Sequence, residues 1–300
     1  MALCKIVLKI ISAFVFINLF SMMMTNAQSG AGPVINAKAE HDIKSKVNGV
    51  NYHLYVSLPK YYSANDTTHY PVLYMLDGGA GFPIAHSTRF LLDLSNEIQD
   101  VIIVAIEYEW ERSLAPWFIN RTRDYTPTRD TSFEKNAIAR SFGVTSSLVS
   151  GGAPAFLDII KTEIIPFIEK TYKTNRDRGI SGHSFGGLFA GYCLLNGTDT
   201  FNKFGINSPS FWWNSREMFT VEKRFSEGRT SLPAQVFMSV GSREGQMMNS
   251  SMKDFADSLA SRKYLNLALT TFVFEGETHV SVVPAMTSRT LKVLYGRRRN

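Results

Sequence analysis

The sequence predicts an α/β fold with a mostly parallel central sheet and helices on both of its faces. Two continuous apolar runs, YPVLYML (70–76) and VIIVAIEY (101–108), are typical of strands that are buried on both sides. Stretches with helical spacing lie between and after such runs, and strands that alternate with helices form parallel sheets. At 300 residues, of which 44% are hydrophobic, the chain suits one large domain of this class.

The predicted elements follow one another regularly along the chain. Residues 50–58 alternate apolar and polar side chains with period two, which indicates a half-exposed strand. A short strand, RGIS (178–181), precedes a glycine-rich turn, and Pro166 is expected to kink the helix at 155–172. The other strands are expected at 70–76, 101–108, 204–210, 234–241 and 267–276, and the other helices near 84–97, 214–226, 250–263 and 281–295.

Three segments lie outside this alternation. Residues 28–48 are polar and are expected to form a loose leader, so the domain is predicted to span 49–296. Residues 109–153 hold aromatic, charged and proline residues with little periodicity, which is typical of a functional loop or an inserted lid. Residues 297–300 form a short basic tail that we expect to be solvated.

The N-terminal segment has the pattern of a signal peptide. Lys5 and Lys9 precede the apolar stretch IISAFVFINLFSMMM, and small residues follow it up to Ala27. The apolar stretch is shorter than the roughly 20 residues of a stable membrane span. We therefore expect residues 1–27 to be removed and the protein to be exported, periplasmic or secreted, with an uncleaved anchor as the alternative.

Charge and cysteine content exclude some classes of function. The formal net charge of +6 is spread along the chain, so no clustered basic face for nucleic acid is expected. Cleavage after Ala27 would remove Cys4 and leave Cys193 as the only cysteine, so no internal disulfide could form. We expect a protein without metal or cofactor.

The segment Gly182-His183-Ser184-Phe185-Gly186 matches the nucleophile-elbow pattern. In such an elbow, a sharp turn between a strand and a helix exposes the serine hydroxyl, and the flanking glycines let the strand and the helix approach each other. We predict that Ser184 is a nucleophile. The alternative is an ordinary glycine-rich turn.

A serine nucleophile needs a base within hydrogen-bond reach and an acid that orients the base. His279 follows the last predicted strand, where parallel strands end together, and it completes the chain order of serine, acid and histidine. Glu244 follows the strand that ends near Gly241 and is the predicted acid. Asp254 and Asp257, on a predicted amphipathic helix, are poorer candidates.

An oxyanion hole needs backbone N–H groups that point at the tetrahedral oxygen. Phe185, directly after the nucleophile, is expected to supply one of them, and Gly79 the other, with Gly78 as the alternative. Of the remaining histidines, His86 is a candidate for lining the pocket, and His183 is expected to pack beside the nucleophile.

Three segments also resemble a known family: YPVLYMLDGG, GISGHSFGGLFAGYCLL with the later NSPSFWWN, and GETHVSVVP. Together they resemble the Putative esterase family of α/β-hydrolases, which includes esterase D, ferric enterobactin (enterochelin) esterases and mycolyl-transferring proteins. SPSFWWN and IIPFIEKTY are most similar to the siderophore-esterase branch. The resemblance covers most of 45–295. It implies an α/β-hydrolase fold, Ser184 and His279 as catalytic residues, Gly79 and Phe185 in the oxyanion hole, and Glu244 as the acid.

Tryptophans and arginines gather in segments that follow the strands, where a substrate would bind. The set is Trp110, Trp117, Trp212 and Trp213 together with Arg112, Arg121 and Arg123. We predict that Trp212, Trp213 and Arg123 bind the substrate, because indoles suit an aromatic or catecholate group and a guanidinium suits an anion. Core packing of the tryptophans and solvation of the arginines are the alternatives.

The sequence thus predicts an exported serine carboxylic-ester hydrolase that acts through a Ser-His-acid triad and an acyl-enzyme, on small siderophore-type or aromatic esters. An acyltransferase on the same scaffold would use the same residues and differ only in the group that accepts the acyl chain. A binding module that has the fold without the chemistry is the non-enzymatic alternative.

Overall fold

A computed structural model of the chain describes residues 38–65, 67–108, 114–135, 140, 142–144 and 148–297. The chain divides after Lys38, and the elements below belong to the part that follows, apart from the first residue of β1. The predicted signal peptide, the leader up to residue 37 and the last three residues of the basic tail lie outside the described residues.

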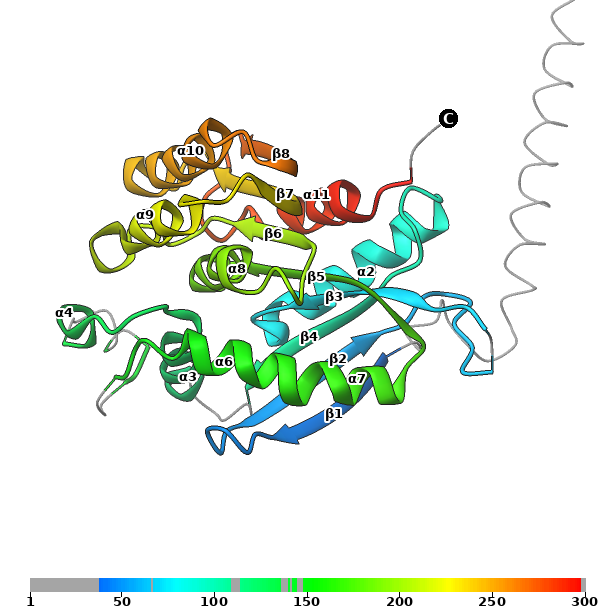
Figure 1. Ribbon diagram of the computed structural model, residues 1–300. Coiled ribbons are helices and arrows are strands. Elements are labelled where there is room, and N and C mark those ends of the chain that lie inside the picture. Colours follow the sequence, from blue (N-terminus) through cyan, green and yellow to red (C-terminus); the bar gives the residue numbers. More distant parts are fainter. Residues whose placement is uncertain are drawn as a thin grey trace, which may run out of the picture. The chain divides into compact units, whose positions relative to one another are not determined.

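The described residues form one eight-stranded sheet (Figure 1). Its order is β1 (Lys38–Lys44), β2 (Asn51–Ser57), β4 (Ile102–Tyr108), β3 (Tyr70–Met75), β5 (Thr174–His183), β6 (Lys203–Asn207), β7 (Ser231–Gly241) and β8 (Leu265–Phe274). β2 pairs with β4 in antiparallel orientation, and every pair from β4 to β8 is parallel. The prediction of a mostly parallel sheet is therefore confirmed.

Helices cover both faces of the sheet, as predicted (Figure 1). α2 and α11 contact each other and cover one face, while α8 packs on the other face against β5 and β6. The helices are α2 (Gly78–Leu94), α3 (Ala115–Tyr125), α4 (Thr131–Glu134), α6 (Ala153–Ile159), α7 (Ile165–Thr171), α8 (Phe185–Asn196), α9 (Trp213–Ser226), α10 (Gln246–Ser261) and α11 (Val283–Tyr295). Within the described ranges, no helix is both long enough and apolar enough to span a membrane.

The central strands are buried on both faces because their apolar residues are consecutive rather than alternating. In β3, Val72 and Tyr74 belong to the core under α8, whereas Leu73 and Met75 belong to the core under α2 and α11. All residues of β3 and β4 are buried. This arrangement leaves the carboxyl ends of the parallel strands as the edge where a ligand can bind.

The prediction that residues 28–48 form a loose leader is wrong for Lys38–Lys44, which form β1 at the edge of the sheet. Ala39 and Ile43 of this strand pack against the core and His41 contacts Phe167 and Tyr172, whereas Glu40, Asp42 and Lys44 are exposed. An edge strand that buries so little has no continuous apolar run, which is why the sequence did not reveal it. The sheet therefore includes residues that precede the predicted start of the domain at residue 49.

Two other regions differ from the expectation. The helix predicted at 155–172 consists of α6, a π-helical turn at Ile160–Ile164, and α7, so the irregularity precedes Pro166. The described part of 109–153, predicted to lack clear elements, contains α3 and α4. α3 buries one side against α8 and α6, and this brings its side chains to the end of β5.

Candidate active site

Ser184 lies at a strained turn between β5 and α8, with φ 61° and ψ −118°. A non-glycine residue in this region of backbone conformation costs free energy, and such strain is common at functional sites. A Cβ on Gly182 would lie 2.4 Å from the carbonyl carbon of Gly186, and one on Gly187 would lie 2.5 Å from the carbonyl oxygen of Asn207. Gly182 and Gly187 are therefore required at this turn, which has the geometry of a nucleophile elbow.

The backbone of Ser184 is fixed by hydrogen bonds to neighbouring elements. Its N–H donates to the carbonyl of Asn207 at the end of β6 (3.1 Å). Its carbonyl accepts from the N–H groups of Leu188 (2.9 Å) and Ser210 (3.1 Å). These contacts hold the strained residue in place and leave its side chain at the wall of a cavity.

His279 and Glu244, from two different loops at the carboxyl end of the sheet, are hydrogen-bonded to each other. Nδ1 of His279 lies 2.6 Å from Oε2 of Glu244. A carboxylate only accepts hydrogen bonds, so the proton of the neutral imidazole lies on Nδ1 and leaves Nε2 as the acceptor. The Glu244 side chain is fully buried, whereas 39% of the His279 side chain is exposed.

Three hydrogen bonds keep the Glu244 carboxylate charged in spite of its burial. Burial by itself raises the pKa of a carboxyl group, but the bonds from His279, from the Ser208 hydroxyl (2.6 Å) and from the Gly241 N–H (2.6 Å) outweigh it. They hold the pKa of Glu244 below its ordinary value. Ser208 lies in the NSPSFWWN segment, and sequence reasoning assigned it no role.

Ser184 and His279 line one cavity of about 370 Å³ at the carboxyl ends of the central strands. α3 contributes Trp117 and Arg121 to the same cavity. The structure thus brings together the predicted nucleophile, the predicted base and the acid bound to that base, although they are distant in the sequence.

His183 packs against the imidazole of His279, with 4.3 Å between the ring centroids. Its Nε2 is buried, and no hydrogen-bond partner for it occurs among the described residues. Burial lowers the pKa of His183 well below its ordinary value, and the neighbouring His279 and Arg121 lower it further. His183 therefore stays neutral, and its uncharged ring packs against the ring of His279.

A buried ion pair, which sequence reasoning did not identify, lies beside the elbow. Arg121 binds Asp77 through two hydrogen bonds, Nε to Oδ1 (3.0 Å) and an Nη to Oδ2 (2.9 Å). Its guanidinium also lies 4.7 Å from the ring centroid of Trp117. Asp77 has a φ of 55° and directly precedes α2, so this pair fixes the turn at which β3 ends.

The structure changes the interpretation of the predicted oxyanion hole. The Gly79 N–H donates to Oε2 of Glu107 (2.5 Å), so this donor is already used within the protein. A carboxylate at the first turn of a helix is favourable, because that end carries partial positive charge. Phe185 is the first residue of α8, where a backbone N–H has no acceptor within the helix.

The three predicted substrate-binding residues, Trp212, Trp213 and Arg123, are not among the residues that line the cavity. Trp213 is completely buried, and its indole N–H donates to the carbonyl of Thr128 (3.2 Å). Trp212 packs against the core and does not line the cavity. Arg123 binds the carboxylate of Asp124 with its Nε (2.6 Å). Packing and local pairing thus account for all three. Trp110 and Arg112 lie outside the described residues.

Two other side chains with possible chemical roles, those of His86 and Cys193, are buried and do not line the cavity. His86 is buried, and its Nδ1 lies 2.7 Å from the Ser57 hydroxyl oxygen, away from the cavity. Cys193 is buried in α8, and burial raises the pKa of its thiol well above the ordinary value. In the part of the chain that the structure describes, no group of three or more His, Cys, Asp or Glu side chains is placed to hold a metal ion.

Comparison with known proteins agrees with this architecture. The model of the Putative esterase family matches residues 45–282. The chain is 28% identical over 260 residues to the ferri-bacillibactin esterase of Bacillus subtilis, covering 83% of this chain and 86% of that protein. It is 30% identical over 179 residues to the siderophore enterobactin esterase of Emericella nidulans, covering 57% of each chain.

Solved structures show the same fold. The BES protein from Bacillus cereus superimposes with a TM-score of 0.73 at 26% identity, covering 89% of this chain and 98% of that one. The siderophore hydrolase EstA from Aspergillus nidulans superimposes with a TM-score of 0.72 at 26% identity, covering 88% of this chain and 97% of that one. These structures confirm the α/β-hydrolase fold. The chain belongs to the Putative esterase family and is a carboxylic-ester hydrolase.

Proposed function

We propose that the protein hydrolyses its ester through a triad of Ser184, His279 and Glu244 and a covalent acyl-enzyme. The observation that carries this proposal is the shared cavity: a serine on a strained turn and an imidazole bound to a buried carboxylate line the same space. Serine, base and orienting acid are the groups that nucleophilic catalysis of acyl transfer requires.

The reaction follows from the protonation states in the site. Nε2 of His279 accepts the proton of the Ser184 hydroxyl while Oγ attacks the ester carbonyl. The imidazolium then gives that proton to the departing alcohol, and Ser184 remains esterified by the acyl group. Water attacks the acyl-enzyme with His279 again as the base, and the proton returns to Ser184 as the acid product leaves.

Glu244 acts on this reaction through His279. Its charged carboxylate fixes the tautomer that exposes Nε2 and stabilises the imidazolium that forms in both steps. Ser208 and Gly241 position Glu244, because each donates a hydrogen bond to Oε1 and leaves Oε2 for His279.

The Phe185 N–H is the oxyanion donor that we assign. It follows the nucleophile directly and stands at the N-terminus of α8, where the helix dipole favours negative charge. The Gly79 N–H becomes a second donor only when Glu107 releases it.

Siderophore-type esters are the substrate class that we propose. The bacterial relative is named as a ferri-bacillibactin esterase and the fungal relative as a siderophore enterobactin esterase. The cavity of this chain presents an indole and a guanidinium, from Trp117 and Arg121, beside the nucleophile. We further propose that the protein is exported and that residues 1–27 are removed, which N-terminal sequencing of the protein from its native host would test.

A hydrolysis panel tests the proposed function. Purified protein is assayed with a catecholate trilactone, an aromatic ester and a short acyl ester, with and without an added alcohol as acceptor. We expect acid products from at least one ester in the wild type and none in Ser184→Ala, while Ser250→Ala, an exposed serine on α10, keeps full turnover. Equal turnover by the wild type and Ser184→Ala would contradict the proposal.

A further inference from the structure

The two edge strands of the sheet differ in charge. β1, at one edge, has the sequence KAEHDIK, and its Glu40, Asp42 and Lys44 are exposed. β8, at the other edge, has the sequence LNLALTTFVF, which contains no charged residue and no proline (Figure 1). Charged side chains and proline are among the means by which proteins keep an edge strand from pairing with another strand. β1 is protected in this way, and β8 is not.

The surface of β8 is apolar and regular. Leu265 is 65% exposed, Val273 is 49% exposed and Phe272 is 37% exposed. Its pairing with β7 runs without a register shift from Leu267 to Phe274. Among the described residues, no strand pairs with the outer edge of β8. An exposed, regular and apolar edge of this kind is a template for another strand.

Every second residue of β8 turns its backbone N–H and C=O away from β7. The carbonyl of Phe274 accepts a hydrogen bond from the N–H of Ser242 (2.9 Å), so the backbone groups of Phe274 face β7. Successive residues of a strand point these groups alternately to its two sides. The residues with outward groups are therefore Leu267, Leu269, Thr271 and Val273.

A second β8 in antiparallel orientation meets these outward groups. With a two-fold axis at Thr270, Leu267 of one strand lies opposite Val273 of the other. Leu269 then lies opposite Thr271. Both members of each pair have outward N–H and C=O groups, so each pair can exchange two hydrogen bonds. One two-fold axis thus satisfies the outward groups of both strands.

The side chains of two such strands also fit one another. Ala268 lies opposite Phe272, where a small residue leaves room for the exposed ring, and Thr270 lies opposite its own copy. Cross-strand pairs of these kinds stabilise antiparallel sheets. The same arrangement of β1 about its central residue would place Glu40 opposite Asp42, and like charges that face each other are destabilising. Self-pairing is therefore favoured at β8 and opposed at β1.

Charges just outside β8 agree with an antiparallel arrangement. Arg262 and Lys263 precede the strand, and Glu275 and Glu277 follow it. Lys263 and Glu275 are exposed. In a two-fold pair, the basic end of each strand lies beside the acidic end of the other, whereas a parallel pair would bring like charges together.

We propose that the protein forms a homodimer in which two copies of β8 pair in antiparallel orientation and join the two sheets into one. This interface goes beyond the proposed function, since no residue of β8 lines the cavity at Ser184. A contact limited to one strand and its flanks belongs to the smaller protein interfaces, so we expect a Kd in the micromolar range.

Sedimentation analysis of the purified protein, from nanomolar to high micromolar concentration, tests the proposal. We expect an equilibrium between monomer and dimer. Thr270→Lys sets two ammonium groups against each other at the two-fold axis and should raise the Kd by about tenfold or more. Thr162→Lys, the same substitution at an exposed threonine before α7, is the matched control and should leave the Kd unchanged.

A charge exchange tests the antiparallel orientation. Lys263→Glu and Glu275→Lys each place like charges together at both ends of the contact and should each raise the Kd about fivefold. The double variant restores opposite charges and should return the Kd to the wild-type value. A double variant that dimerises more weakly than both single variants would contradict the antiparallel pairing.

Hydrogen exchange of the backbone amides locates the interface. The N–H groups of Leu267, Leu269, Thr271 and Val273 should gain protection as the protein concentration rises. A wild type that stays monomeric at every concentration, or a dimer that Thr270→Lys leaves intact, would overturn the inference. None of these measurements uses an ester, so such a result would leave the proposed function standing.

Discussion

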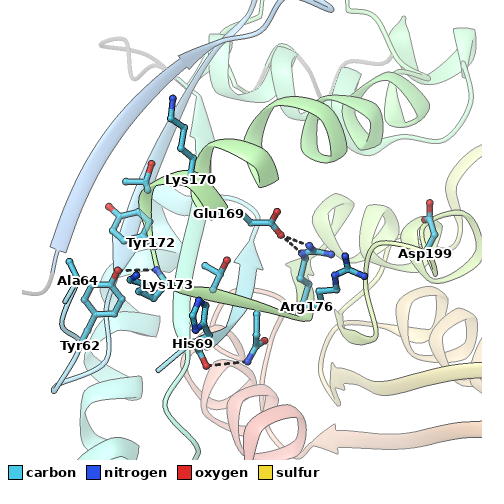
Figure 2. Close-up of a pocket in the computed structure, with 13 residues that line it drawn as sticks. Tyr62, Ala64, His69, Glu169, Lys170, Tyr172, Lys173, Arg176 and Asp199 are labelled. Atoms are coloured by element: carbon cyan, nitrogen blue, oxygen red, sulfur yellow. Dashed lines mark hydrogen bonds and ion pairs between the residues drawn. The ribbon is translucent and has the colours of Figure 1, made fainter. Parts of the chain in front are cut away.

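Two hollows lie at opposite ends of β5, and only one of them has the groups of a catalytic site. The first, which we call the basal hollow, surrounds the start of the strand and includes Thr174, Asn175 and Arg178 (Figure 2). The second is the cavity at Ser181–His183, where the strand ends. Arg178, which lines the basal hollow, and Ser181, which lines the cavity, are three residues apart along β5, or roughly 10 Å. The basal hollow has a volume of about 640 Å³, against about 370 Å³ for the cavity at Ser184.

Polar groups of the basal hollow pair with one another. Nε of Arg178 donates to the carboxylate of Glu169 (3.1 Å). The backbone N–H of Lys173 donates to the Tyr62 hydroxyl (3.0 Å). Such pairs on an exposed surface contribute little free energy and need no ligand.

The difference shows that volume alone does not identify a site. The smaller cavity, at the other end of β5, is lined by the strained Ser184 and by His279. The imidazole of His279 is hydrogen-bonded to the buried carboxylate of Glu244. Strain and buried charge cost stability, and proteins keep them where function requires them. Matched substitutions at the two ends of β5 test this contrast.

The largest effect is expected from the nucleophile. Ser184→Ala removes the attacking oxygen and should lower kcat/KM for a cleaved ester by about 10³- to 10⁶-fold, while the fold is retained. Thr174→Ala, at the other end of the same strand, should leave kcat/KM unchanged. Comparable losses in both variants would show that the strand as a whole, and not Ser184, limits activity.

The acid should matter less than the nucleophile. Glu244→Gln keeps the size of the side chain but removes the charge that stabilises the imidazolium, and we expect a loss of about 10²- to 10⁴-fold in kcat. Glu169→Gln in the basal hollow is the control. Wild-type kcat in Glu244→Gln would remove Glu244 from the triad.

The third contrast concerns stability. Arg121→Met leaves the Asp77 carboxylate without its partner in a buried place and should cost about 3–5 kcal/mol of unfolding free energy. Arg178→Met breaks a more exposed pair and should cost about 0–1 kcal/mol. Urea denaturation of both variants measures the difference, and equal costs would contradict a special role for the pair beside the elbow.

The smallest effect is a pH dependence of stability. The folded protein disfavours a proton on His183, because its pKa is lowered well below 6.5, whereas the unfolded chain takes up that proton below about pH 6.5. The unfolding free energy should therefore fall as the pH drops below about 6.5 and be level above it. His183→Asn should flatten this slope, and Thr174→Ala in the basal hollow should not. A slope that is identical in all three proteins would rule out His183 as its source.

Patterns within short segments predicted much of this architecture. β3 and β4 were recognisable because burial on both faces requires consecutive apolar residues, and the elbow was recognisable because Gly182 and Gly186, four positions apart, meet in the turn. The positions of His279 and Glu244 followed from the rule that loops after parallel strands meet at one edge of the sheet.

What the sequence did not predict depends on contacts between distant residues. The pairing of Arg121 with Asp77 joins residues 44 positions apart. The bond from the Gly79 N–H to Glu107 uses a backbone donor that no side-chain pattern reveals. Trp213 was expected in the pocket, but a large apolar ring gains more free energy in the core than at a wall exposed to water.

Covalent labelling with a fluorophosphonate, followed by peptide mapping, measures whether Ser184 is the activated nucleophile. The reagent phosphonylates a serine hydroxyl only where a base activates it and donors stabilise the developing charge. We predict a single adduct on Ser184, slower labelling of Glu244→Gln and no adduct in Ser184→Ala. A protein that cleaves esters while the adduct maps to another serine, or to none, would contradict the account.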